Sequence, residues 1–238
     1  MPLLSRLALA LQRRFASETL SVSFMTSIIS LITSIFALGW QISDYMTGPN
    51  VMLIAPDQIT IGSSEQVKFP LRGGGPYVHF IAQMSYVNKG AIGYNATVKS
   101  ERVRVKVANM KPFEHRWFRF VTSDSGGPDG WKLQVTKVRD AGPFPITAGT
   151  ASSQETLFQP RPKNCSGAVS KCSERQDYVT WDYFIQSLTA SADHTIEFEI
   201  LADLYERAEP ISIKCTVKID KLDELREHRW GSPVCFKT

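Results

Sequence analysis

The chain has 238 residues and a formal net charge of +4 at pH 7, a length that suits one domain of ordinary size plus an additional segment. Its apolar fraction of 43% and charged fraction of 21% are typical of a folded protein and exclude wholesale disorder. Because the basic residues are scattered among acidic ones, we expect no nucleic-acid partner.

Residues 1–19 form the first predicted segment, a basic amphipathic tail. Leu4, Leu7 and Leu11 fall on one face of a helix, and Arg6 and Arg13 fall on the opposite face. This pattern is typical of a helix that lies on an anionic membrane surface. The alternative is a short disordered tail that only sets the orientation of the chain in the membrane.

The stretch SVSFMTSIISLITSIFALGWQIS follows, and no charged residue lies between Glu18 and Asp44. A helix over residues 20–43 is apolar on every side and exceeds the roughly 20 residues that cross a bilayer. Trp40 lies where an aromatic belt is expected. We therefore predict a transmembrane helix at 20–43 that stays in the lipid bilayer. The alternative is a cleaved signal peptide, with Ala37-Leu38-Gly39 as its cleavage motif.

The flanking charges predict the orientation of this helix. Arg6, Arg13 and Arg14 precede it, whereas no Lys or Arg follows until Lys68. The positive-inside rule places the N-terminus in the cytoplasm of a cell-membrane protein. Residues 44–50 then form a short tether, and residues 51–238 form an extracytoplasmic domain.

Small hydroxyl residues along the predicted helix suggest a docking face for another membrane helix. Ser27, Ser30 and Ser34 are the candidates, because small and hydroxyl residues favour close helix contacts in membranes. The alternative is a lone helix whose hydroxyls bond to the carbonyl four residues earlier.

From Val51 onward the apolar period changes to two, which predicts β-strands. The clearest cases are RVRVKV at 102–107, TIEFEI at 195–200 and ISIKCTVKI at 211–219. Glycine- and proline-rich stretches separate the strands and predict turns. Two helices are expected as exceptions, one over 178–188 with Asp177 as its N-cap and one after residue 220.

This rhythm of short strands and turns resembles the immunoglobulin-like sandwich domains of many membrane-anchored and secreted proteins. The resemblance implies a mainly β fold, an antiparallel immunoglobulin-like β-sandwich preceded by one N-terminal transmembrane helix. True immunoglobulin domains place one cysteine on each of two facing strands, whereas here Cys215 alone falls on a clearly predicted strand.

The four cysteines all lie in the C-terminal part of the chain, at Cys165, Cys172, Cys215 and Cys235. An even number suits two disulfides outside the cytoplasm. One bridge within 165–172 would staple a loop, and one between Cys215 and Cys235 would hold the C-terminal segment, with other pairings left open. A zinc site with His228 as a ligand is the alternative, but the usual pair spacing is absent.

The low-charge connection DAGPFPITAGTASSQETLF contains four large apolar residues, and long loops often carry function. Phe144, Ile146, Leu157 and Phe158 are therefore candidate loop residues for binding a partner. The alternative is an edge strand that packs these side chains into the domain.

No nucleophile, base and orienting group can be argued together, and we predict no catalytic residue, metal or cofactor. The sequence favours a membrane-anchored protein-interaction module with a protein partner in or near the membrane. The alternatives are an accessory or structural subunit of a membrane complex that docks through the serine-bearing helix and, less favoured, an envelope enzyme.

Overall fold

A computed structural model describes residues 22–43, 48–67, 76–91, 93–108, 110–126, 132–160 and 178–238. Its contacts divide the chain into two units, Met1–Gly48 and Pro49–Thr238.

The described part of the first unit is one helix, Val22–Ser43, with a mean hydropathy of 1.9 in its most apolar window. Its side chains are exposed on every side within the chain. Twenty-two helical residues measure about 33 Å, which exceeds the roughly 30 Å of a hydrocarbon core. The helix is therefore long and apolar enough to span a membrane.

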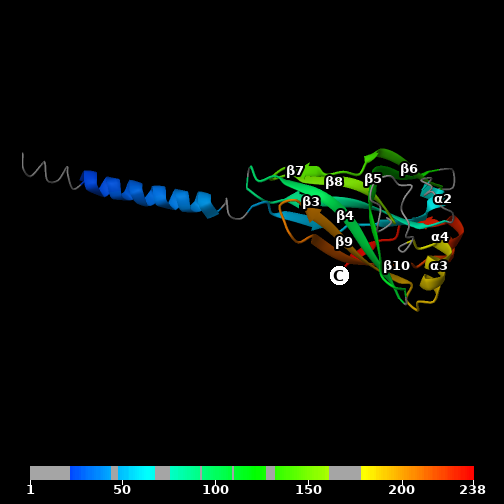
Figure 1. Cartoon of the computed structure of the whole chain (residues 1–238). Coiled ribbons are helices and arrows are strands. Elements are labelled where there is room, and N and C mark those ends of the chain that lie inside the picture. The colour runs from blue at the N-terminus through cyan, green and yellow to red at the C-terminus, as the bar shows by residue number, and fades with distance from the viewer. Residues whose placement is uncertain are drawn as a thin grey trace, which may run out of the picture. The chain divides into compact units, whose positions relative to one another are not determined.

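The second unit is mainly β and begins directly with a strand (Figure 1). Its elements in chain order are β1 (Val51–Ile54), β2 (Ile59–Ser63), α2 (Ser64–Val67), β3 (Val78–Asn88), β4 (Ala96–Val107), β5 (Phe113–Gly126), β6 (Lys132–Asp140), β7 (Phe144–Ile146), β8 (Ala151–Pro160), α3 (Trp181–Thr189), β9 (Thr195–Leu204), β10 (Ile211–Lys218), α4 (Leu222–His228), β11 (Trp230–Gly231) and β12 (Cys235–Lys237).

All of these strands belong to one antiparallel sheet of 12 strands, in the order β11-β2-β3-β8-β5-β4-β9-β10-β12. β1 adds to β3, β6 adds to β5 and β7 adds to β4. The sheet curls on itself (Figure 1). Because the described strands form one continuous network, the two facing sheets of the predicted immunoglobulin-like sandwich are not confirmed. Apolar alternation predicts strands well, but it does not specify how the two ends of a sheet meet.

The C-terminal segment pairs with strands near both ends of the sheet. β11 pairs with β2, and β12 pairs with β10. Between these pairings, the N–H of Ile59 donates to the carbonyl of Pro233 at 3.2 Å, and the N–H of Cys235 donates to the carbonyl of Asp57 at 2.9 Å. Residues 230–237 therefore join β2 to β10 through backbone hydrogen bonds.

The main core lies on one face of the sheet, and a smaller cluster lies on the other. Along β3, Phe80 and Met84 belong to the main core, whereas Ile81 belongs to the smaller cluster with Leu133 and Leu157. This division follows from the alternation of side chains across a strand. Both faces of β3 are therefore buried near its start, which explains its mixed apolar pattern.

Helix α3 packs its apolar side against the main core. Trp181, Phe184, Ile185 and Leu188 are buried, as the helical spacing predicts. Its N-cap is Thr180, whose side chain accepts a hydrogen bond from the backbone of Tyr183. The predicted cap, Asp177, lies outside the described residues and is not the residue that begins this helix.

Candidate functional site

The four predicted loop-binding residues are buried parts of the sheet. Phe144 and Ile146 lie on β7, and Leu157 and Phe158 lie on β8, with exposed fractions of 4%, 0%, 0% and 1%. β7 pairs with β4, and β8 lies between β3 and β5. These residues therefore lie in buried strands and not in an exposed binding loop, as the edge-strand alternative expects of their packing. β7 is an edge strand, whereas β8 lies inside the sheet.

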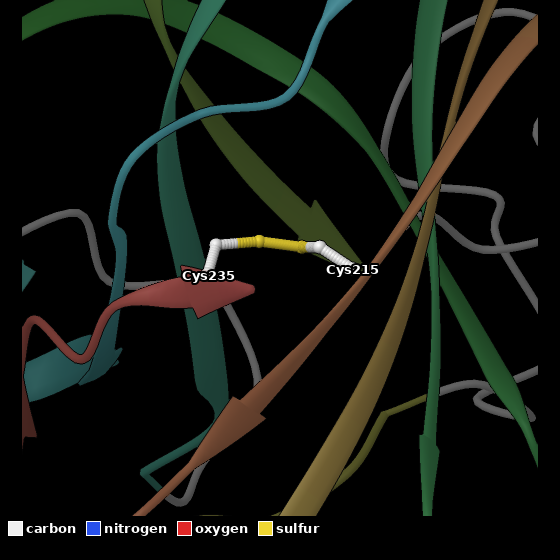
Figure 2. Close-up of a disulfide and its surroundings, with 2 residues drawn as sticks. All are labelled: Cys215 and Cys235. Carbon is white, nitrogen blue, oxygen red and sulfur yellow. A yellow bond between two sulfur atoms is a disulfide. The ribbon is translucent and has the colours of Figure 1, made fainter. Parts of the chain in front are cut away.

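Cys215 on β10 and Cys235 on β12 form a disulfide (Figure 2), with their Cα atoms 5.6 Å apart. Both residues are buried, and the bridge closes a loop with a sequence separation of 20. It therefore attaches the C-terminal segment to β10 covalently. Cys165 and Cys172 lie outside the described residues. Within the described chain, no group of three His, Cys, Asp or Glu side chains is arranged to hold a metal.

Two of the three candidate docking serines bond to their own helix. The hydroxyl of Ser27 donates to the carbonyl of Ser23 at 2.9 Å, and that of Ser34 donates to the carbonyl of Ser30 at 2.8 Å. Such bonds reduce the cost of a hydroxyl in an apolar environment. All three serines are exposed within the chain, and docking through them stays a prediction.

A buried polar pair lies in the interior of the sheet. The phenol of Tyr86 on β3 donates to the carboxyl of Glu101 on β4 at 2.6 Å, and both residues are 0% exposed. Burial raises the pKa of Glu101 to about 7, although the hydrogen bond from Tyr86 acts in the opposite direction. The other carboxyl oxygen has no hydrogen-bond partner among the described residues. Burial therefore favours a neutral Glu101 carboxyl at mildly acidic pH.

Two histidines are also enclosed. His79 and His115 are 0% exposed, and burial lowers the pKa of His79 to about 4 and that of His115 well below its usual value. The His115 ring packs against the rings of Phe80 and Phe113, with centroids 5.1 and 5.2 Å away, and these two rings also contact each other at 6.2 Å. Glu101, His79 and His115 are therefore all enclosed by the described residues.

The outer face of β4 and β9 carries a ladder of ion pairs. Lys106 pairs with Glu197 at 3.0 Å, and Arg104 pairs with Glu199 at 2.6 Å. In both pairs the two residues are directly opposite in the strand register. The predicted outward charges of RVRVKV and TIEFEI therefore meet across the two strands and favour this register.

A polar cleft of about 600 Å³ is lined by residues of β2, β3, β5, β6 and β8 and of the C-terminal segment. Its lining includes Glu155 of β8, Ser123 of β5, Leu133 of β6 and Trp230 of β11. The Glu155 carboxylate accepts the backbone N–H of Ser123 at 2.8 Å and also the hydroxyl of Ser123. The backbone N–H of Ser123 therefore points toward Glu155 on β8 and away from β6.

The chain matches no protein-family model, and neither curated proteins nor solved structures give a match.

Proposed function

We propose that this protein is a single-pass membrane protein whose β-domain lies outside the cytoplasm and binds another protein. The observation that carries the proposal is the helix Val22–Ser43, because a helix that is apolar all round and unburied by its own chain needs an apolar environment. The arginines of residues 1–19 favour a cytoplasmic N-terminus.

The proposed arrangement keeps the helix as an anchor at 20–43, with residues 44–50 as a tether. A tether of about seven residues reaches at most about 25 Å, so the domain stays close to the bilayer. The disulfide between Cys215 and Cys235 supports an oxidising compartment, because disulfides persist there and are rare in the cytosol. In this proposal the curled β-sheet, in place of the predicted sandwich, forms the extracytoplasmic domain that binds the partner protein.

Crosslinking in native membranes, followed by mass spectrometry, tests the binding function. We expect crosslinks from surface lysines of the domain to a reproducible neighbour protein, and an intact Cys215–Cys235 peptide in the same sample. A domain that crosslinks only to itself at all reagent concentrations would count against an interaction module.

A second candidate function is an accessory subunit of a membrane complex that docks through Ser27, Ser30 and Ser34. The exposure of all three serines on the helix supports it, because small hydroxyl residues allow close helix contacts in membranes. The intrahelical hydrogen bonds of Ser27 and Ser34 fit the lone-helix alternative equally well. Replacing all three serines with leucine is expected to abolish co-purification with the neighbour. Met25→Leu, Ile32→Leu and Phe36→Leu change the opposite face and form the matched control, which should co-purify normally.

A further inference from the structure

The polar cleft lies on the sheet face that also carries the smaller apolar cluster. Ile81 and Leu133 belong to that cluster and line the cleft, and Trp230 packs against the cluster and lines the cleft as well. The cleft volume of about 600 Å³ lies within the range of small-molecule sites, about 300–1,000 Å³. The cleft is therefore large enough for a ligand, and part of its lining is apolar and includes an aromatic residue.

The strand register brings polar lining residues of the cleft to this same face. Thr60 of β2 is directly opposite Ile81 of β3. Two residues further along β3, Gln83 is directly opposite Glu155 of β8. The hydroxyl of Ser232, next to β11, is hydrogen-bonded to that of Thr60 at 2.7 Å. Because directly opposite residues present their side chains on one face of a sheet, polar groups from four neighbouring segments border the cleft together.

Two of these polar side chains are held in place and keep further hydrogen-bonding capacity. The Glu155 carboxylate accepts the N–H and the hydroxyl of Ser123, and an ionised carboxylate has about four acceptor positions. The side-chain amide of Gln83 donates to the hydroxyl of Ser153 at 3.0 Å, which uses one of its two N–H groups and leaves its carbonyl oxygen as an acceptor. Such prepositioned groups bind a ligand at a low cost of side-chain ordering.

The charges of the cleft limit the ligands that fit it. Its described lining residues include Asp57, Asp124 and Glu155 but no Lys, Arg or His. Carboxylates repel anionic ligands and accept hydrogen bonds from hydroxyl groups. The remaining polar lining residues are neutral and carry hydroxyl or amide groups: Gln58, Thr60, Gln83, Ser123, Ser125 and Ser232. A ligand that has many hydroxyl groups and no negative charge therefore suits this lining.

We propose that this cleft binds a neutral saccharide. A sugar ring carries hydroxyl groups around its edge and apolar C–H groups on its faces. The hydroxyl groups suit the carboxylates and amides of the cleft, and the C–H groups suit the apolar part formed by Ile81, Leu133 and Trp230. A basic peptide is less suited, because neutral polar residues outnumber carboxylates in the described lining. This inference goes beyond the proposed protein-binding function and does not depend on it.

Isothermal titration calorimetry of the full chain tests the proposal, in micelles of a detergent that has no sugar head group. The probes are three neutral tetrasaccharides, namely maltotetraose, cellotetraose and the tetramer of N-acetylglucosamine, together with tetragalacturonate and tetralysine. We expect at least one neutral tetrasaccharide to bind, with an affinity that changes less than about twofold between about 50 mM and about 500 mM salt, because an uncharged ligand is not screened. Tetragalacturonate should bind at least about tenfold more weakly, because its carboxylates meet those of the cleft.

Variants separate the polar contribution from the aromatic one. Gln83→Ala removes an exposed amide from the cleft, and we expect about fivefold weaker binding of the neutral tetrasaccharide. Gln134→Ala is the matched control, because Gln134 is also exposed on a strand but does not line the cleft. Trp230→Ala should weaken binding about tenfold. Because Trp230 also packs against the smaller cluster, thermal unfolding checks that this variant folds, and Gln83→Ala decides the outcome if it does not.

Absence of binding by all three neutral tetrasaccharides would overturn the proposal. Equal binding by the wild-type chain and the Gln83→Ala variant would also overturn it, because the sugar would then bind elsewhere. Salt-sensitive binding of tetralysine without binding of a saccharide would assign the cleft to a basic peptide instead. If crosslinking still finds a neighbour protein while these results are negative, the protein-binding function stands and only the saccharide site fails.

Discussion

Cys215 on β10 and Cys235 on β12 are joined by a disulfide where the C-terminal segment completes the pairing of the sheet. On the other side of this segment, the N–H of Cys235 donates to the carbonyl of Asp57, just before β2. Cys235 therefore makes two connections. Its disulfide joins it to β10, and its backbone N–H joins it to the residues before β2, near the opposite end of the sheet.

Replacing both cysteines with alanine is expected to lower the free energy of unfolding by about 3 kcal/mol, because a closed loop of about 20 residues no longer restricts the unfolded chain. Chemical denaturation measured with and without a reductant checks this. The reductant should have a smaller effect on the double variant than on the wild-type chain. A double variant as stable as the oxidised wild type would contradict a stabilising role for the bridge.

Glu101→Gln tests the neutral carboxyl in the core through pH dependence. The folded pKa of about 7 lies above the ordinary value of 4.5, so the folded chain holds more protons and loses stability as pH rises from about 4.5 to 7. The buried histidines act in the opposite direction below about pH 6.5, so the difference between variant and wild type is the informative quantity. We expect the variant to gain about 3 kcal/mol relative to the wild type over this range. A difference that does not change with pH would show that Glu101 titrates normally.

Tyr86→Phe removes the hydrogen bond that Glu101 accepts from the phenol, while keeping the ring that packs against Phe144 at 5.7 Å. Loss of a hydrogen bond to a buried polar group costs about 1–3 kcal/mol. Thermal unfolding at pH 5 should therefore show a clear loss of stability. In the Glu101→Gln background the same substitution should also be costly, because the amide oxygen accepts the same bond. An unchanged unfolding temperature in both backgrounds would contradict the importance of this bond.

Glu199→Gln weakens the ion-pair ladder on the outer face, because Glu199 pairs with Arg104 at 2.6 Å and with Lys214 at 3.8 Å. Exposed pairs contribute little, so the expected loss is about 0.5–1 kcal/mol at low salt and less at high salt, where screening weakens the charges. Denaturation at two ionic strengths measures both effects. A loss that is independent of salt would indicate a packing role for Glu199 instead.

Several strands and both C-terminal helices could be predicted from the sequence because their patterns are local. Val103, Val105 and Val107 are buried, as the alternation in RVRVKV predicts, and α4 occupies the predicted helix after residue 220. The same alternation places Glu101 on the buried face, because it lies two and four residues before Val103 and Val105 on one strand. It was missed because an acidic residue in an alternating strand is normally placed on the solvent side.

The closure of the sheet and the role of β7 and β8 could not be predicted in this way. The pairing of residues 230–237 with both β2 and β10 depends on contacts far apart in the sequence. β7 has only three residues, with Pro145 between Phe144 and Ile146, and such a strand is too short for a clear alternation. The low charge around these residues reflects burial of the strand instead of an exposed binding loop.

A topology reporter fused after Thr238 tests the central claim most directly, with the same reporter fused before Met1 as the matched control. The account predicts that the C-terminal fusion is active outside the cytoplasm and the N-terminal fusion inside it, with the chain retained in the membrane fraction at full length. A C-terminal fusion that reads out in the cytoplasm would contradict the extracytoplasmic domain, and with it the compartment proposed for the disulfide.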